Sequence, residues 1–183
     1  PELFFENKPE DGEEYAKIFG REKNDRNLKW IKKKYLKLPD NFDFYKVMVP
    51  KANGSGAIGE VLSTPVVGHP VVGHTLTFLS IGKFKTKVEA EACLKYIKSK
   101  FARAMLGTLK VTQDNPRETW ANVPLQDFTK NSDIDWNKSI SAIDVKASQK
   151  YELSINEIDA QLYAKYGLTK EEIVFIEKHV KAM

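Results

Sequence analysis

Residues 84–113 read FKTKVEAEACLKYIKSKFARAMLGTLKVTQ, and this stretch predicts the longest helix of the chain. Thr86 and Glu89 have the spacing of a capping box, in which a hydroxyl and a carboxylate each accept a hydrogen bond from a free backbone N–H at a helix start. Apolar side chains then recur every three or four residues and form one stripe. They are Leu94, Ile97, Phe101, Ala104 and Met105. We therefore predict one core helix that starts after Thr86, stops near Gly107 and has a basic outer rim.

The residues before this helix predict strands. Residues 45–49 (YKVMV) have strand composition and alternation and are closed by Pro50, and residues 75–81 alternate polar and apolar side chains up to the core helix. Between them, Val-Val-Gly-His occurs twice, at 66–69 and 71–74. The prolines and glycines there favour an irregular or edge strand.

The end of the chain predicts a helical hairpin. Ser154 with Glu157, and Thr169 with Glu172, repeat the capping-box spacing, and Gly167 separates the two helices that they open. Together these patterns predict an α+β fold, in which a small mixed sheet packs on a long core helix and a C-terminal helical hairpin follows.

The first forty residues predict a separate segment. Residues 1–22 are acidic and weakly periodic, which is typical of a linker or docking strip, and apolar residues within 23–37 suit a short basic helix that ends before Pro39. The chain begins at Pro1 without an initiator methionine, so we expect a piece of a longer polypeptide. Residues 1–40 would join a missing upstream catalytic part to a domain at 41–183.

Composition favours a soluble globular protein. The chain has 183 residues, of which 30% are charged and 42% apolar. No apolar run approaches the roughly 18 residues of a membrane span, and no leader pattern opens the chain, so we expect a cytoplasmic protein without a membrane partner. The single cysteine, Cys93, cannot form an intrachain disulfide and fits a reducing compartment as a buried structural thiol.

The charge is unevenly distributed. Residues 1–14 carry six acids and one lysine, whereas residues 15–51 carry eleven Lys/Arg against four acids, and residues 83–110 carry eight against two. Clustered lysines near aromatic residues can follow a phosphate backbone, and a solvated lysine face has the same sequence pattern. The candidates for phosphate contact are Lys32, Lys33, Lys98 and Arg103.

Two polar segments leave the rigid elements. One follows the strand at 45–49, and the other follows the core helix. Arg can bond guanine through two hydrogen bonds, and Asn or Gln can do so with adenine, so these segments suit readout of the DNA major groove. The candidate base readers are Lys51, Asn53, Ser55, Gln113, Asn115 and Arg117. The alternative is that residues 113–115 simply fold a turn against Trp120.

Catalytic motifs are missing from the sequence. The glycine-rich stretch 51–56 lacks the Gly-Lys-Ser/Thr ending of a Walker motif, and His69 and His74 have no third metal ligand nearby. Glu6-Asn7-Lys8 and Asp144-Val145-Lys146 lack the partner acid of a nuclease site. We expect this chain by itself to be non-catalytic, with no metal and no cofactor.

Several motifs resemble the carboxy-terminal region of adenine-specific DNA methyltransferases of bacterial restriction–modification systems, including those fused to a restriction endonuclease. They are residues 49–56 (VPKANGSG), 95–103 (KYIKSKFAR), 112–117 (TQDNPR), 123–128 (VPLQDF) and 163–168 (YAKYGL). The resemblance runs from about Tyr45 to the end of the chain.

The resemblance implies a division of labour between two parts of one polypeptide. In that family the Asn/Asp-Pro-Pro-Tyr motif and the S-adenosylmethionine site lie upstream, and neither motif occurs here. This chain would then be the DNA target-recognition domain, its partners would be double-stranded DNA and the upstream methyltransferase domain, and S-adenosylmethionine would serve the parent enzyme. The alternative class is a protein-interaction or scaffold domain that docks the catalytic part through Trp30, Trp120 and Trp136.

Overall fold

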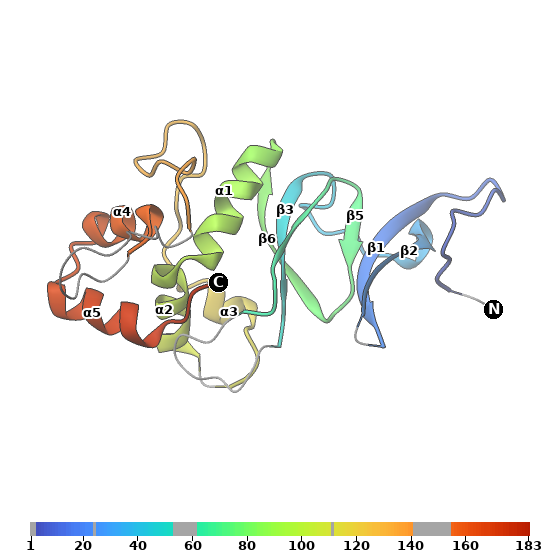
Figure 1. The fold of residues 1–183 in the computed structure, drawn as a ribbon. Helices are drawn as coiled ribbons and strands as arrows, with labels where there is room; N and C mark the ends of the chain where they lie inside the picture. The colour runs from blue at the N-terminus through green and yellow to red at the C-terminus, as the bar shows by residue number, and fades with distance from the viewer. Residues whose placement is uncertain (1–2, 24, 53–61, 111, 141–154) are drawn as a thin grey trace.

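The computed structural model describes residues 3–23, 25–52, 62–110, 112–140 and 155–183. The fold is α+β: two three-stranded sheets, a pair of consecutive core helices and a C-terminal helical hairpin. In Figure 1 these parts follow one another across the molecule, from the hairpin through the core helices and the central sheet to the N-terminal sheet.

The central sheet contains β3 (Tyr45–Pro50), β4 (Val66–Gly68) and β6 (Phe78–Phe84) in the order β4-β3-β6, with antiparallel pairing throughout. Its middle strand β3 is buried from Lys46 to Pro50. Val47 and Val49 belong to the main buried cluster, which also contains Cys93 and Ile97 of the core helix. This packing confirms the predicted arrangement of a small sheet on a core helix, although the sheet on the helix is antiparallel and not mixed.

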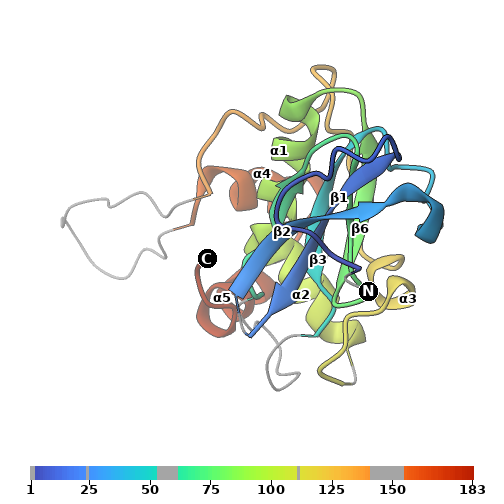
Figure 2. The same ribbon diagram turned by 90° about the vertical axis from the view of Figure 1, so that its right-hand side faces the viewer.

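The N-terminal sheet contains β1 (Tyr15–Glu22), β2 (Asp25–Lys32) and β5 (Val72–His74) in the order β2-β1-β5. β1 and β2 are antiparallel, and β1 and β5 are parallel, so this sheet is mixed. Figure 2 shows β1 and β2 lying across the central sheet. Ring packing of Phe19 against Phe78, with centroids 4.8 Å apart, joins the two sheets.

The prediction of a basic helix within residues 23–37 is wrong. Residues 25–32 form a strand, and only Lys33–Tyr35 takes a helical turn, of the 3-10 type. Residues 15–22, expected as part of a linker, supply the partner strand along its whole length. Strand pairing has overridden the local pattern, because Leu28 and Ile31 have helical spacing while Leu28 and Trp30 equally have strand spacing.

The core helix is divided at Ser99 into α1 (Lys87–Lys98) and α2 (Lys100–Leu109). The capping box of Thr86 and Glu89 is confirmed at the start of α1. Ser99 has ψ 151°, and its Oγ accepts from the Ala102 N–H at 3.1 Å, so this residue starts a second helix. The predicted apolar stripe remains buried across the break, but Gly107 lies inside α2 and does not end it.

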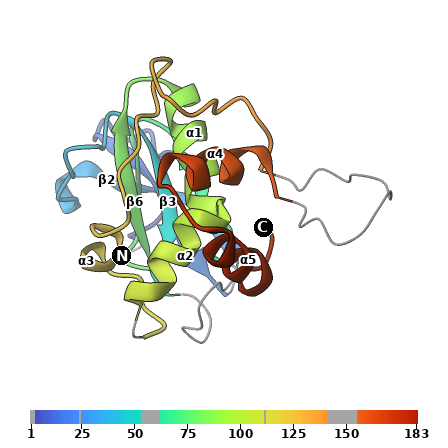
Figure 3. The ribbon, with the colours of Figure 1, turned by 90° about the vertical axis from the view of Figure 1, so that its left-hand side faces the viewer.

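The C-terminal hairpin consists of α4 (Glu157–Lys165) and α5 (Lys170–His179), and a short helix α3 (Arg117–Trp120) precedes it in sequence. The capping box of Thr169 and Glu172 is confirmed, and Gly167 takes a positive φ of 62° between the helices. The N-cap of α4 is Asn156, whereas the expected Ser154 lies outside the described residues. Figure 3 shows the hairpin packed beside α2.

Among the described residues, none of the helices has both the length and the apolar character needed to cross a membrane.

Cys93 is expected to be chemically inert in the folded protein. Its side chain is buried in α1, and desolvation raises the pKa of the thiol, so little reactive thiolate is present. Under native conditions a thiol reagent should modify the protein only as fast as it unfolds, while in denaturant one equivalent should react at once. Rapid modification of the native protein, followed by absorbance or mass spectrometry, would contradict the burial.

Candidate nucleic-acid interface

The end of β3 and the segment before α3 lie side by side. The backbone N–H of Asn115 donates to the carbonyl of Lys51 at 2.7 Å, and Ala52 and Asp114 form an isolated antiparallel bridge. These two segments are more than sixty residues apart in sequence. The structure therefore brings together the two polar segments that were predicted to read bases.

The turn between β5 and β6 adjoins the same place. The backbone N–H of Lys51 donates to the carbonyl of Thr77 at 2.9 Å, and Pro50 pairs with Phe78 in the strand register. Lys51 is thus held through its N–H on one side and its carbonyl on the other. The backbone is fixed, and the side chain remains exposed.

The predicted base readers divide by exposure. Lys51, Gln113 and Arg117 have exposed side chains, with Arg117 at the first position of α3. Asn115 is 0% exposed, and among the described residues its side-chain nitrogen and oxygen have no hydrogen-bond partner. Its amide does not reach a base edge in this conformation, which favours the turn interpretation for Asn115, whereas the side chain of Gln113 is exposed. Asn53 and Ser55 lie outside the described residues.

Arg103 is not on a basic outer rim. The side chain is 2% exposed, and its Nε donates to the carbonyls of Lys98 and Ser99 at 3.1 and 3.3 Å while Nη2 donates to the carbonyl of Lys181. Burial lowers the pKa of Arg103 to about 10. The predicted phosphate contact of Arg103 is therefore wrong, because its guanidinium is buried and donates to backbone carbonyls within the protein. Lys98, the other candidate on the core helix, is half-buried.

The rest of the expected rim is also covered by protein. Lys95 donates to the carbonyls of Trp136 and Lys138, and Lys100 forms an ion pair with the buried carboxylate of Glu177. The sequence could not show this, because the covering residues lie about forty to eighty positions further along the chain.

Lys32 and Lys33 already have anionic partners within the chain. Lys32 Nζ lies 2.9 Å from Asp11 and 3.3 Å from Glu13, and Lys33 Nζ lies 3.3 Å from Glu14. The hydrogen bond from Lys32 lowers the pKa of Asp11 to about 2, and the same bond raises the pKa of Lys32. The acidic N-terminal residues thus neutralise this end of the β1–β2 ribbon, which weakens the case for phosphate contact by these two lysines.

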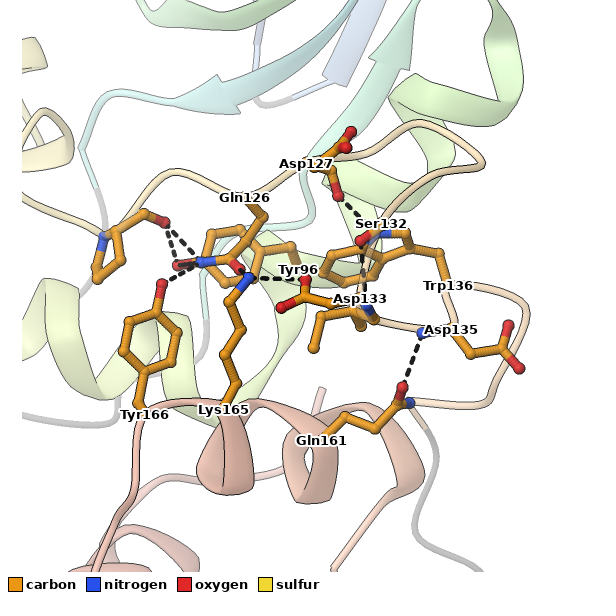
Figure 4. Close-up of polar contacts among 12 residues, drawn as sticks. Tyr96, Gln126, Asp127, Ser132, Asp133, Asp135, Trp136, Gln161, Lys165 and Tyr166 are labelled. Carbon is orange, nitrogen blue, oxygen red and sulfur yellow. Dashed lines mark hydrogen bonds and ion pairs between the residues drawn. The ribbon is translucent and has the colours of Figure 1, made fainter.

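Three of the five motifs quoted above, at 95–103, 123–128 and 163–168, meet around Gln126 (Figure 4). Gln126 Nε2 donates to the Tyr166 hydroxyl at 2.7 Å and to the Pro124 carbonyl at 3.1 Å, and Lys165 Nζ donates to Gln126 Oε1 at 3.0 Å. The Tyr96 hydroxyl donates to the same Pro124 carbonyl at 2.6 Å. These contacts connect α1, the segment around Gln126 and the end of α4, so they hold the C-terminal hairpin in place.

Replacing Gln126 with Ala is expected to lower the free energy of unfolding by about 1–2 kcal/mol. Gln126 is buried, and without it Tyr166 and Pro124 lose a hydrogen-bond donor while Lys165 loses an acceptor. Urea unfolding followed by circular dichroism would measure the change. The matched variant Gln113→Ala removes an exposed side chain and should leave the midpoint unchanged. Equal midpoints for the two variants would show that the Gln126 contacts contribute nothing to stability.

The three tryptophans proposed as docking anchors have internal contacts. Trp136 is buried, and its Nε1 donates to the Asp127 carbonyl and to Ser132 Oγ at 2.9 and 3.0 Å. Trp30 pairs with Phe5 through the backbone, and the centre of its ring lies 5.1 Å from Lys17 Nζ. Trp120 is half-buried against the core. Their packing gives little support to docking through tryptophans.

No family model matches this chain, and neither a curated protein nor a solved structure does so.

Proposed function

We propose that this chain is the DNA target-recognition domain of a bacterial adenine-specific DNA methyltransferase of a restriction–modification system, with or without a fused endonuclease. The observation that supports it best is the pairing of Lys51 with the segment 113–117. Three exposed side chains with base-reading chemistry, on Lys51, Gln113 and Arg117, lie on two segments that are joined by the hydrogen bond from the Asn115 N–H to the Lys51 carbonyl.

The local construction suits base readout. β3 is a buried central strand, and α3 starts at Arg117, so regular elements on both sides orient the exposed side chains. Arg117 can donate two hydrogen bonds to guanine, and Gln113 can both donate to and accept from adenine. Lys51 adds a positive charge that suits a phosphate or a guanine.

The proposed division of labour explains why no catalytic motif is required here. A methyltransferase must take the target adenine out of the base stack, which costs a few kcal/mol, and a separate domain can supply register and sequence specificity. The upstream methyltransferase domain would hold S-adenosylmethionine and perform the transfer. The chain described here would contribute no group to that reaction.

Selection from a randomised duplex pool tests the proposal. The purified chain would be mixed with the pool at low salt, and bound duplexes would be sequenced over several rounds. We expect one short motif to be enriched, and binding to the selected duplex to weaken steeply with salt because Lys and Arg displace counterions from phosphates. Absence of both enrichment and salt-dependent binding would overturn the proposal.

A further inference from the structure

We infer that Leu76, at the tip of the turn between β5 and β6, is a wedge that enters between two stacked base pairs of the bound duplex and unstacks them. This inference rests on the proposed function and deepens it, because it assigns a deformation of the DNA to a residue of this chain. The affected step would lie beside the bases that Lys51, Gln113 and Arg117 are proposed to read.

Leu76 is the most exposed large apolar side chain among the residues that the structure describes, at 92% of its possible surface. Single apolar residues are common on protein surfaces, so exposure alone does not indicate a function. Leu76 differs from a side chain on a loose loop, because the backbone around it is fixed while the side chain makes almost no contact with the rest of the protein.

Hydrogen bonds hold the turn to both neighbouring sheets. The Thr75 N–H donates to the Phe19 carbonyl of β1 at 2.9 Å, and the Thr77 carbonyl accepts from the Lys51 N–H at 2.9 Å. The hydroxyls of Thr75 and Thr77 are hydrogen bonded to each other at 2.7 Å. Leu76 stands between these two threonines, so the turn presents its side chain to solvent on a rigid support.

The turn lies beside the candidate interface. Lys51 and Thr77 continue the antiparallel register of β3 with β6. Cα atoms of such a pair are about 5.5 Å apart and consecutive Cα atoms about 3.8 Å apart, so the Leu76 Cα lies within about 9 Å of the Lys51 Cα. Base pairs stack about 3.4 Å apart, which makes this distance equal to about three steps of the duplex. In Figure 1 the turn, the end of β3 and the segment before α3 all lie along the lower edge of the molecule.

The charge of the turn and of its flanking strands is compatible with a polyanion. Residues 61–88 contain no aspartate and no glutamate, so neither the turn nor β5 nor β6 has a side chain that phosphates would repel. The exposed Lys51 adds a positive charge next to the turn. An apolar tip between neutral hydroxyls can therefore approach the bases of a duplex.

Leucine is one of the apolar side chains that proteins insert between base steps, where it separates the stacked faces and kinks the duplex. Pyrimidine–purine steps unstack most easily, so the wedge should add a preference for such a step at a position that no polar side chain contacts. The deformation is separate from removal of the target adenine, for which the upstream domain would provide the pocket.

The test uses 2-aminopurine, an adenine analogue whose fluorescence is quenched in stacked DNA, placed in turn at each position in and beside the motif of the selected duplex. The wild-type chain should raise the fluorescence at one step, and Leu76→Ala should abolish the increase while the preferred bases stay the same. Leu76→Met keeps a long apolar side chain and should retain the increase.

A duplex with one base removed at that step gives a second measurement. The wild type should bind this duplex about tenfold more tightly than the intact one, because the stacking that opposes insertion is already lost. Leu76→Ala should bind the two duplexes equally. Equal affinity of the wild type for the two duplexes would overturn the inference.

Leu125→Ala is the matched control, because Leu125 is 89% exposed but lies elsewhere in the fold. Its neighbours Pro124 and Gln126 are hydrogen bonded to Tyr96 of α1 and to Tyr166 at the end of α4. This variant should keep both the fluorescence increase and the preference for the duplex with the missing base. Circular dichroism would verify that all variants keep the wild-type fold.

Failure of this inference is distinguishable from failure of the proposed function. If the wild type binds in a salt-dependent way and Arg117→Ala alters its base preference, but no position gains fluorescence or Leu76→Ala keeps the gain, Leu76 is not a wedge and the proposed function stands. If the wild type binds no duplex from the pool, the proposed function fails and the wedge with it.

Discussion

Replacing Asp159 with Ala is expected to lower the free energy of unfolding by about 3–5 kcal/mol, the largest effect of any single substitution considered for this protein. Asp159 is buried in α4, and its carboxylate accepts from the backbone N–H groups of Lys100 and Phe101 at 3.0 and 2.8 Å. It therefore caps the first turn of α2 from another helix, where the dipole favours a negative charge.

The cost arises from the groups that the truncation would leave without a partner. Two N–H groups at the start of α2 and the amide of Asn156 donate to this carboxylate. Its negative charge also favours the charged form of the buried Arg103 and so raises the Arg103 pKa, against the effect of burial. Burial raises the pKa of Asp159, and the three donors act against that shift. Buried donors and a buried positive charge that lose their acceptor cost more free energy than the interactions contribute net when they are made.

Denaturant unfolding would measure the effect, with Glu91→Ala as the control. Glu91 is a half-buried partner of Lys87 in α1, in an i,i+4 pair at 2.9 Å whose loss should cost at most about 0.5 kcal/mol. Asp159→Asn keeps the shape and one acceptor and should fall between the two. A change in Asp159→Ala no larger than in Glu91→Ala would mean that the contacts between α2 and α4 do not support the fold.

Replacing Arg117 with Ala is expected to weaken binding to the selected duplex by about 1–3 kcal/mol and to relax the preference at one base pair, since a bidentate contact to guanine would be lost. Gln113→Ala should relax the preference at a different base pair. The two effects should be separable because the side chains stand on either side of the buried Asn115.

Repeating the selection with each variant would reveal which position of the enriched motif changes. Lys85→Ala is a suitable control, because it removes one exposed positive charge just beyond the far end of β6, the strand that starts beside Lys51. It should preserve every position of the motif. Should Arg117→Ala and Gln113→Ala preserve the motif while the protein unfolds at lower denaturant, residues 113–117 form a structural turn and not a reading segment.

The sequence by itself determined the elements whose signals are local. The capping boxes at Thr86 and Thr169, the glycine at 167 and the alternation around β3 each act through atoms a few residues apart, so their spacing was sufficient to predict them. The apolar stripe of the core helix also stayed buried across the break at Ser99, because burial follows the helical period on both sides of it.

Only the tertiary structure decided the fate of the charged residues. Arg103 looked like part of a basic rim, but the C-terminal chain covers it, and the lysines at 32 and 33 meet acids from about twenty residues earlier. The strand at 25–32 likewise required a partner at 15–22 that local spacing does not reveal. Ion pairs, burial and strand pairing depend on which distant segments come together, and a side chain's own sequence neighbours do not contain that information.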